Sequence, residues 1–251
     1  MSRSDSNEPG RLDNALVARG LAPTRARARD AILRGHVTVD GALATRPSAS
    51  VEAGAAIVID DPAAHYVSRA ALKLIAGLDR FGFAPAGRAV LDIGASKGGF
   101  TQVLLERGAG KVFAVDVGHG QLDPRLAADP LVVAREGLNA RDLVAADIGE
   151  PVAAIVADVS FISLRLVLPP ALALAADDAW GVFLVKPQFE VGREALGKGG
   201  IVRDPQVAER AAADIATWLE TEMGWRVRGV ILAPIAGGDG NRELLIGARR
   251  G

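Results

Sequence analysis

A lysine and an aspartate that end two separate apolar segments are the first candidates for chemistry. Only five of the 29 basic residues are lysines, and one of them, Lys186, directly follows the apolar run GVFLV. Asp158 follows the apolar run VAAIVA in the same way. Burial of an uncompensated charge is costly, so a lysine in this position needs a partner. Either Lys186 and Asp158 form a structural salt bridge, or they form a base held beside an acid.

A glycine-rich turn, LDIGASKGGF, points to a nucleoside cofactor. Gly94, Gly98 and Gly99 allow a tight turn and a close approach of the backbone to a ligand. The spacing differs from the dinucleotide fingerprint, and the turn lacks the ending of a phosphate loop. Asp116 ends the next strand pattern, where an acid accepts hydrogen bonds from ribose hydroxyls. Asp92, just before the turn, is expected to orient the backbone or the positive end of the ligand. S-adenosylmethionine fits this arrangement best.

The composition excludes several chemistries, because the chain contains no cysteine. A cysteine nucleophile is impossible, which rules out the mechanism of cytosine-carbon methyltransferases. The three histidines are scattered, so no metal site is expected. The segment ADVSFIS also lacks the proline-rich run of amino-group methyltransferases. The longest uncharged run, residues 166–176, is too short to span a bilayer, and the N-terminal segment lacks an apolar core. A soluble, cytoplasmic protein without membrane contact is therefore expected.

Strand patterns alternate with helical patterns from residue 90 onward. This alternation predicts an α/β fold with a mostly parallel sheet covered on both faces. Seven strands are expected, at residues 89–93, 111–116, 131–134, 152–158, 180–186, 225–232 and 243–248. Helices are expected between them at residues 100–108, 164–176 and 204–224. No helix separates the last two strands, which predicts an antiparallel final strand. Asp158 and Lys186 are then expected at the carboxyl edge of the sheet, where ligands bind.

The first sixty residues follow a smaller pattern. Two short helices, the second capped by Thr24, precede a hairpin with its turn at Asp40-Gly41. Seven arginines and three aspartates lie between residues 11 and 46. The run RARAR is compatible with a solvated helix face, but the order of elements resembles the S4 domain, a small RNA-binding module. That resemblance implies contacts to structured RNA, and the expected RNA-binding residues are Arg11, Arg19, Arg25, Arg27, Arg29, Arg34 and Arg69.

The later motifs resemble the TlyA family of haemolysin-A-like proteins. These motifs are VSRAALKL, LDIGASKGGFTQVLLERGA, VDVGHGQL, ADVSFISL, LVKPQFEVG and GNRELL. The resemblance implies a Rossmann-like class I methyltransferase domain of the FtsJ type, with S-adenosylmethionine as cofactor and a catalytic tetrad of Lys73, Asp158, Lys186 and Glu243. The implied cofactor-binding residues are Asp92, Gly94, Ala95, Ser96, Gly98, Gly99, Phe100, Asp116, Asn139 and Asp158. The linker departs from the family pattern, since it carries His65 and Tyr66 where a bulkier aromatic arrangement is expected.

These patterns divide the chain into four parts. A disordered lead-in is expected over residues 1–10, and an S4-like RNA-binding domain over residues 11–60. A bridging helix is expected over residues 61–80, followed by an S-adenosylmethionine-dependent methyltransferase domain over residues 81–251.

The resemblance implies 2′-O-methylation of a ribose in ribosomal RNA, at a cytidine, on free rRNA or ribosomal subunits. Lys186 is the expected base, Asp158 positions it, and Glu243 orients Lys73 or the ribose. Positioning is expected to contribute more than basicity, because well-oriented reactants recover about 7–11 kcal/mol of a barrier. The alternative is a non-catalytic RNA-binding or ribosome assembly factor that retains the cofactor fold. The loop spacing disfavours an NAD-linked oxidoreductase, and no feature supports a membrane-lytic role.

Overall fold

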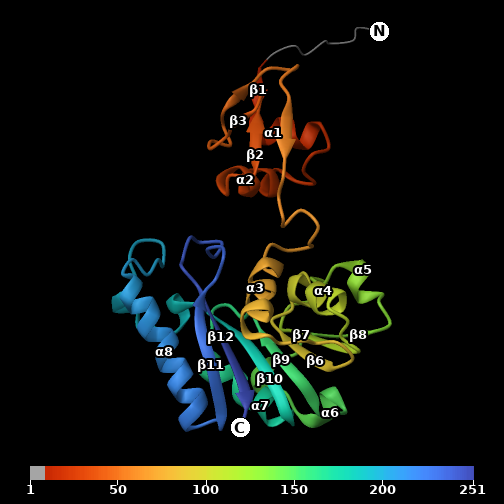
Figure 1. Ribbon diagram of the computed structural model, residues 1–251, viewed down its shortest axis with the longest axis vertical. Helices are drawn as coiled ribbons and strands as arrows, with labels where there is room; N and C mark the ends of the chain where they lie inside the picture. Colours follow the sequence, from red (N-terminus) through yellow and green to blue (C-terminus); the bar gives the residue numbers. More distant parts are fainter. Residues whose placement is uncertain (1–8) are drawn as a thin grey trace. The chain divides into compact units, whose positions relative to one another are not determined.

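The computed structural model describes residues 9–251, and the chain divides into two units. The first unit ends at His65, and the second runs from Tyr66 to Gly251 (Figure 1). The lead-in expected over residues 1–10 lies mostly outside the described residues. Its last residue, Gly10, belongs to a strand that pairs with Val51.

The first unit is a small α+β domain. Its helices are α1 (Leu12–Ala18) and α2 (Arg25–Leu33), and its strands are β1 (Gly10–Arg11), β2 (Val37–Val39), β3 (Ala42–Leu43), β4 (Ser50–Val51) and β5 (Ile57–Ile59). Strands β3, β2 and β5 form one antiparallel sheet, and β1 pairs with β4. The Thr24 hydroxyl accepts a hydrogen bond from the Arg27 N–H (3.3 Å), which caps α2 as expected. Asp40 and Gly41 both have positive φ, as a two-residue hairpin turn requires.

The second unit is built on a seven-stranded sheet. Its strands are β6 (Ala89–Ile93), β7 (Lys111–Asp116), β8 (Val132–Glu136), β9 (Val152–Ala157), β10 (Ala175–Val185), β11 (Trp225–Leu232) and β12 (Leu244–Arg250). They are ordered β11-β12-β10-β9-β6-β7-β8. Only β12 runs against its neighbours; the strands from β10 to β8 pair in parallel. This topology confirms the expected Rossmann-like class I methyltransferase sheet of seven strands, in which the last is antiparallel.

Helices cover both faces of this sheet (Figure 1). The helices are α3 (Ala71–Phe81), α4 (Gly99–Glu106), α5 (Pro124–Ala127), α6 (Ala145–Ile148), α7 (Leu164–Ala173) and α8 (Pro205–Thr221), with single 3₁₀ turns at Ala140–Asp142, Pro187–Phe189 and Arg193–Ala195. Helices α3 and α4 share one core with side chains such as Val90 and Val182. Helices α7 and α8 share the other, larger core with Ile155 and Ile246. The result is a three-layer unit whose parallel strands are buried on both faces.

The helix expected over residues 61–80 is shorter and differently placed. It begins at Ala71, and residues 61–70 form turns in which the Asp61 carboxylate accepts a hydrogen bond from the Ala63 N–H (2.8 Å). Helix α3 belongs to the second unit. A Cβ atom at Gly77 would lie 2.8 Å from the Val182 side chain, so glycine allows α3 to lie close to β10. Within residues 9–251, none of the helices combines the length and the apolar character that crossing a bilayer requires.

Candidate active site

Three adjoining hollows lie at the carboxyl edge of the parallel strands. One of about 450 Å³ lies over the ends of β6, β7 and β9, and one of about 460 Å³ lies between the segment after β10 and the segment before β12. We call these the cofactor hollow and the target hollow. A smaller one of about 170 Å³ runs along the glycine-rich turn. Ser160 lines all three, and Lys186 lines the target hollow and the smaller one.

The glycine-rich turn forms one wall of the cofactor hollow. Gly94 has φ +79°, and a Cβ atom there would lie 2.5 Å from the Asp158 carbonyl oxygen, so only glycine fits between β6 and β9. Gly98 has φ +93° and precedes α4, which begins at Gly99. Gly94 and Ser96 line the cofactor hollow, and Ala95, Gly99 and Phe100 line the smaller hollow beside it. The turn therefore leaves room for a ligand at the start of α4.

Asp116, at the end of β7, connects the turn to the second wall of the cofactor hollow. Its Oδ2 atom accepts a hydrogen bond from the Ser96 N–H (2.8 Å), and its Oδ1 atom accepts one from the Gly118 N–H (2.7 Å). Each carboxylate oxygen retains a lone pair for a further donor. Asn139 lines the same hollow, and its Oδ1 atom accepts a hydrogen bond from the Arg141 N–H (3.1 Å). Both residues thus lie where the sequence predicts cofactor contacts.

Asp92 lies beneath the turn and lines none of the three hollows. It is completely buried, and its Oδ2 atom accepts a hydrogen bond from the Thr101 hydroxyl (2.6 Å). Its Oδ1 atom has no hydrogen-bond partner among residues 9–251. Burial raises the pKa of Asp92 to about 7, and the nearby charges of Asp158 and Asp116 act in the same direction. Of the two expected roles, orientation of the backbone therefore fits the geometry, and direct contact with the ligand does not.

Lys186 and Asp158 form an ion pair between the hollows. The Lys186 Nζ atom lies 2.7 Å from Asp158 Oδ1 and donates a hydrogen bond to the Ser160 hydroxyl (2.8 Å). Both side chains come from the ends of neighbouring parallel strands, β10 and β9. The two side chains are therefore in contact, as both a structural salt bridge and a base held beside an acid require. An ammonium group has three N–H donors and only one is bonded to Ser160, so donor capacity remains for a ligand.

Lys73 and Glu243 form a second pair next to the first. The Lys73 Nζ atom donates a hydrogen bond to Glu243 Oε2, and the two residues are only 5% and 3% exposed. Burial raises the pKa of Glu243, while the charges of Lys73 and Lys186 lower it. Glu243 lines the target hollow together with Lys186. The structure therefore brings all four residues of the expected tetrad to one place.

Residues that the sequence analysis missed complete the walls of the target hollow. Phe161 is 89% exposed, has φ +66°, and lies next to Phe189, with ring centroids 5.1 Å apart. Glu190 fixes this loop by accepting hydrogen bonds from the Ser163 hydroxyl (2.6 Å) and the Leu164 N–H (2.9 Å). Phe161 also lines the cofactor hollow. The one available signal was an aromatic residue in the segment SFIS, shortly after the strand expected to end at Asp158.

The arginines expected to bind RNA have different surroundings. In the first unit, Arg11 and Arg25 both pair with the buried Asp13, whose pKa lies well below its usual range because of these bonds. Arg34 pairs with Asp30 and Asp61. Two more bond to backbone carbonyl groups, Arg19 to those of residues 52, 53 and 55, and Arg27 to that of residue 63.

The other two arginines that were expected to bind RNA are Arg29 and Arg69. Arg29 is exposed on α2, and no bond to it is found within residues 9–251. Arg69 lies in the second unit, partly buried near Gly238. Most of the expected RNA-binding arginines thus also hold the first unit together. Within the same described part of the chain, no group of three or more acidic or histidine side chains is placed to hold a metal ion.

Comparisons with known proteins agree with this architecture. The FtsJ-like methyltransferase family matches residues 66–250, and the S4 domain family matches residues 10–57. The chain is 47% identical over 240 residues to the 16S/23S rRNA (cytidine-2′-O)-methyltransferase TlyA of Mycobacterium tuberculosis, covering 95% of this chain and 89% of that protein. It is 37% identical to Hemolysin A of Brachyspira hyodysenteriae, covering 94% and 98%. A solved structure from Streptococcus thermophilus, described as a proposed hemolysin, is 36% identical with a TM-score of 0.75, covering 97% of this chain and 89% of that one.

Both matches together cover nearly all of the chain, with the S4 domain first and the methyltransferase domain second. This is the order of parts that the motifs predict. The chain belongs to the TlyA family of FtsJ-like methyltransferases.

Proposed function

We propose that this chain transfers a methyl group from S-adenosylmethionine to the ribose 2′-hydroxyl of a cytidine in ribosomal RNA. The observation that carries the proposal is the convergence of Lys73, Asp158, Lys186 and Glu243 beside the hollow at the glycine-rich turn. The named activity of the Mycobacterium tuberculosis relative, 47% identical, supports the same reaction and substrate.

The cofactor hollow has the shape and chemistry that S-adenosylmethionine needs. Its volume of about 450 Å³ lies within the range of small-molecule sites. The apolar side chains of Val115, Leu138 and Ile162 offer a surface for an adenine ring, and Asp116 offers acceptors for ribose hydroxyls. Gly94 allows the turn to pass close to the Asp158 carbonyl group at one wall of this hollow. When bound, this cofactor supplies an electrophilic methyl group on a positively charged sulfur.

Lys186 is the residue that acts on the ribose. Its Nζ atom forms an ion pair with Asp158 and donates a hydrogen bond to Ser160, and a further N–H donor can hold the 2′-oxygen in the target hollow. The same atom accepts the 2′-hydroxyl proton when the amine is neutral. Holding the oxygen in line with the methyl group supplies most of the rate enhancement.

Lys73 and Glu243 act as positioning residues. Lys73 comes from α3 and Glu243 from the segment before β12, so their buried pair joins two elements around the target hollow. Glu243 lines the target hollow together with Lys186, and the charges of Lys73 and Lys186 favour the carboxylate form against the effect of burial on its pKa. We assign to this pair the task of setting the position and the local charge of Lys186.

Phe161 offers a stacking surface for the base of the target nucleotide. Single-stranded and unstacked bases are commonly bound by exposed aromatic side chains. Phe161 lines both the cofactor hollow and the target hollow, where a nucleotide with its ribose at Lys186 would place its base. A target base rotated out of its stack therefore has a partner in the protein.

The test is methyl transfer to ribosomal subunits from cells that lack this protein. The full-length chain and Lys186→Ala are compared with tritiated S-adenosylmethionine, and the product is identified by mass spectrometry of rRNA nucleosides. Loss of a positioned proton acceptor is expected to lower the rate by about 10²–10⁴-fold. Lys111→Ala is the control, because Lys111 forms an exposed pair with Glu150 (2.6 Å) at the start of β7, the end of that strand opposite to Asp116 and the cofactor hollow.

Two outcomes contradict the proposal. If the wild-type chain leaves no 2′-O-methyl mark on either subunit, the substrate is wrong. If Lys186→Ala binds subunits and methylates them as well as the wild type does, Lys186 is not catalytic. A chain that binds subunits but never methylates them would be the non-catalytic assembly factor.

A further inference from the structure

Three arginines lie together at the edge of the sheet that is opposite the candidate active site. Arg226 and Arg249 face each other across the antiparallel pair β11–β12, and Arg228 lies at a bulge in β11. All three are exposed. We call them the amino-edge arginine patch. Because β11 is parallel to β10, its first residues lie about 20 Å from the carboxyl edge of the sheet.

The patch carries an electrostatic cost within the protein. Like charges directly opposite each other on neighbouring strands are destabilising, since their Cβ atoms are about 4.5–5.5 Å apart. Within residues 9–251, none of the three arginines forms an ion pair. Two acids in neighbouring segments have other partners: Asp178 pairs with Arg88 (3.1 Å), and Glu220 accepts a hydrogen bond from the Val227 N–H (3.2 Å). Neither of these two carboxylates is therefore paired with an arginine of the patch.

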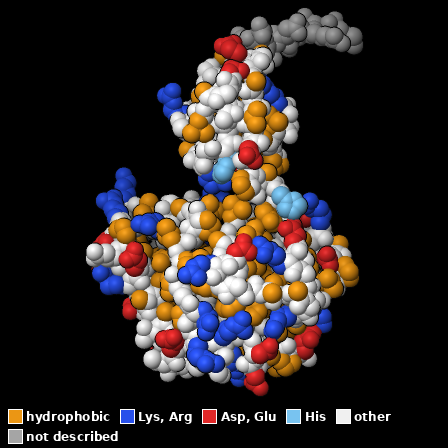
Figure 2. All heavy atoms as spheres, in the orientation of Figure 1, with side chains coloured by type: hydrophobic (Ala, Val, Ile, Leu, Met, Phe, Trp, Pro, Cys, Tyr) orange, Lys and Arg blue, Asp and Glu red, His pale blue; other side chains and the backbone are white. Residues whose placement is uncertain are grey.

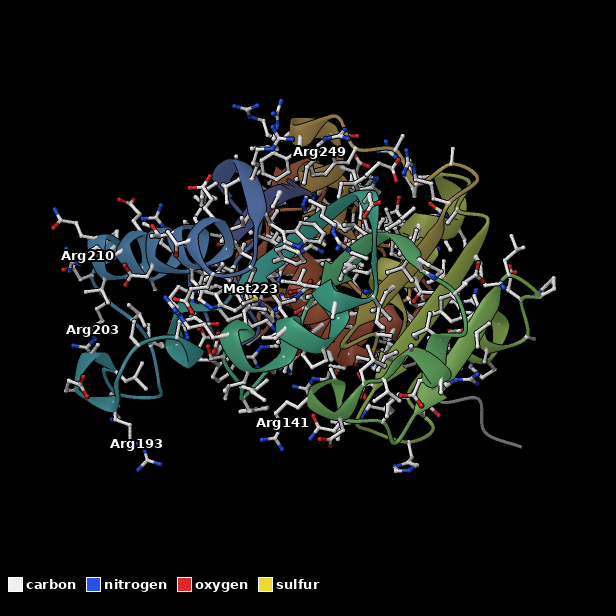
Figure 3. All side chains as sticks on the ribbon, turned by 90° about the horizontal axis from the view of Figure 1, so that it is seen from below. Arg141, Arg193, Arg203, Arg210, Met223 and Arg249 are labelled. Atoms are coloured by element: carbon white, nitrogen blue, oxygen red, sulfur yellow. The ribbon has the colours of Figure 1, made fainter. Side chains whose placement is uncertain are left out.

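Arg249 is held in place by aromatic rings. Its guanidinium group lies 5.1 Å from the centroid of the Phe83 ring, and Phe83 stacks on Trp180 (5.1 Å). Figure 3 shows Arg249 on the α3 side of the sheet, opposite to Arg141 and Arg193. In Figure 2, Lys and Arg side chains gather over the lower part of the second unit, where β11 and β12 lie in Figure 1. A planar guanidinium supported on a ring presents its donors in a fixed direction, which suits the oxygens of a phosphate.

We propose that the amino-edge arginine patch binds the phosphate backbone of the rRNA substrate, as a second contact remote from the reacting ribose. The proposal rests on the proposed function for the identity of its ligand. The chain as a whole has a net charge of −1, so the patch is a local feature and not part of a general basic surface. Phosphate contacts of this kind hold and orient a protein on RNA without reading its sequence. The patch thereby keeps the methyltransferase unit on the subunit while the target ribose enters the site.

The test is the salt dependence of binding to intact 30S and 50S ribosomal subunits. The full-length chain is compared with Arg226→Gln/Arg228→Gln/Arg249→Gln. The control variant is Arg88→Gln/Arg107→Gln/Lys111→Gln, which changes the net charge equally but removes cations already paired with acids. Dissociation constants are measured between 50 and 200 mM KCl. Each lost phosphate contact lowers the slope of log affinity against log salt concentration by about 0.7–0.9. Over this range, the affinity of the wild-type chain should therefore fall about 20- to 40-fold more than that of the patch variant, which lacks three contacts.

Three further measurements make the outcome decisive. Circular dichroism and S-adenosylmethionine binding report whether the variants remain folded and able to bind the cofactor, independently of methylation. An unchanged salt slope in the patch variant, or an equal change in the control, overturns the proposal. Vesicles of phosphatidylglycerol and phosphatidylcholine are the third arm: if the patch variant loses binding to these vesicles and keeps its affinity for subunits, the surface serves a membrane and the proposal fails. Because binding is the readout, the result stands whether or not methylation is observed.

Discussion

Lys73 and Glu243 are 170 residues apart in the sequence, yet their side chains form a buried ion pair. Helix α3 supplies the lysine, and the segment entering β12 supplies the glutamate. Burial raises the pKa of Glu243, and the lysine opposes this shift by stabilising the carboxylate. The carboxylate of Glu243, which lines the target hollow, is therefore both held in place and kept closer to its charged form by a lysine of α3.

Removal of one partner of this pair is expected to be costly. Glu243→Leu leaves the Lys73 ammonium buried without a counter-charge and should lower the free energy of unfolding by about 3–5 kcal/mol. The double variant Lys73→Met/Glu243→Leu should recover most of that loss, because two apolar side chains can replace a buried pair. Urea denaturation measures both. For the exposed pair Lys111–Glu150, Lys111→Met should lower the free energy of unfolding by less than about 1 kcal/mol. Equal losses in the single and double variants would show that the two charges are not coupled.

The raised pKa of Asp92 predicts a specific dependence of stability on pH. The folded-state pKa is about 7, against an ordinary value of 3.8. Between these values the folded protein holds a proton that the unfolded chain releases, so the contribution of Asp92 to stability falls as the pH rises from about 4 to about 7. Over the whole range the free energy of unfolding should fall by about 4 kcal/mol on account of Asp92, because each pKa unit corresponds to about 1.36 kcal/mol.

Asp92→Asn should remove this dependence. Asparagine has the same shape, and its oxygen can still accept the hydrogen bond from the Thr101 hydroxyl. Urea unfolding at pH 4.5, 5.5, 6.5 and 7.5 should show a stability that declines less with pH in the variant than in the wild type. Identical pH profiles for the two proteins would mean that Asp92 titrates normally despite its burial.

The fold was predictable because its signals are local. Short apolar runs such as VAAIVA and GVFLV, alternating with helical patterns, are typical of the buried strands of a parallel sheet, and the strands they predict are present as β9 and β10. Of the helix expected over residues 61–80, only the part from Ala71 onward forms, and it continues to Phe81 within the second unit. An apolar period over 71–81 marks the helix correctly, but whether it packs on a sheet or spans a linker depends on contacts such as that of Gly77 with Val182.

The candidate site was only partly predictable from local sequence patterns. Asp158 and Lys186 follow from the rule that the ends of parallel strands meet at one edge. Lys73 and Glu243 came only from family resemblance, because no local pattern pairs residues on a helix and on a late strand. The internal bonds of Arg11, Arg25 and Arg34 could not be foreseen either. Charge alone does not distinguish an arginine that binds RNA from one that neutralises a buried aspartate.

Phe161 should contribute to substrate binding more than to stability. Its ring is almost fully exposed, so Phe161→Ala removes little burial. Loss of stacking on the target base should lower kcat/KM for ribosomal subunits by about 5- to 150-fold, the equivalent of about 1–3 kcal/mol. Phe161→Trp should retain activity. Leu166→Ala, at another exposed apolar residue, is the control. An unchanged kcat/KM for Phe161→Ala would show that the target base does not stack on Phe161.

Arg29 and Arg34 lie on or next to the same helix and should behave in opposite ways. Arg29 is exposed, and no bond to it is found within residues 9–251, so Arg29→Ala should weaken binding to subunits and reduce its salt dependence without changing the melting temperature. Arg34 pairs with Asp30 and Asp61, at 2.9 and 2.6 Å, in a largely buried position. Arg34→Ala leaves two carboxylates without their partner and should lower the stability of the first unit. Thermal unfolding and subunit binding of the two variants separate the roles. Equal effects of both variants on stability would show that Arg29 is as structural as Arg34, and the RNA surface of this unit would then lie elsewhere.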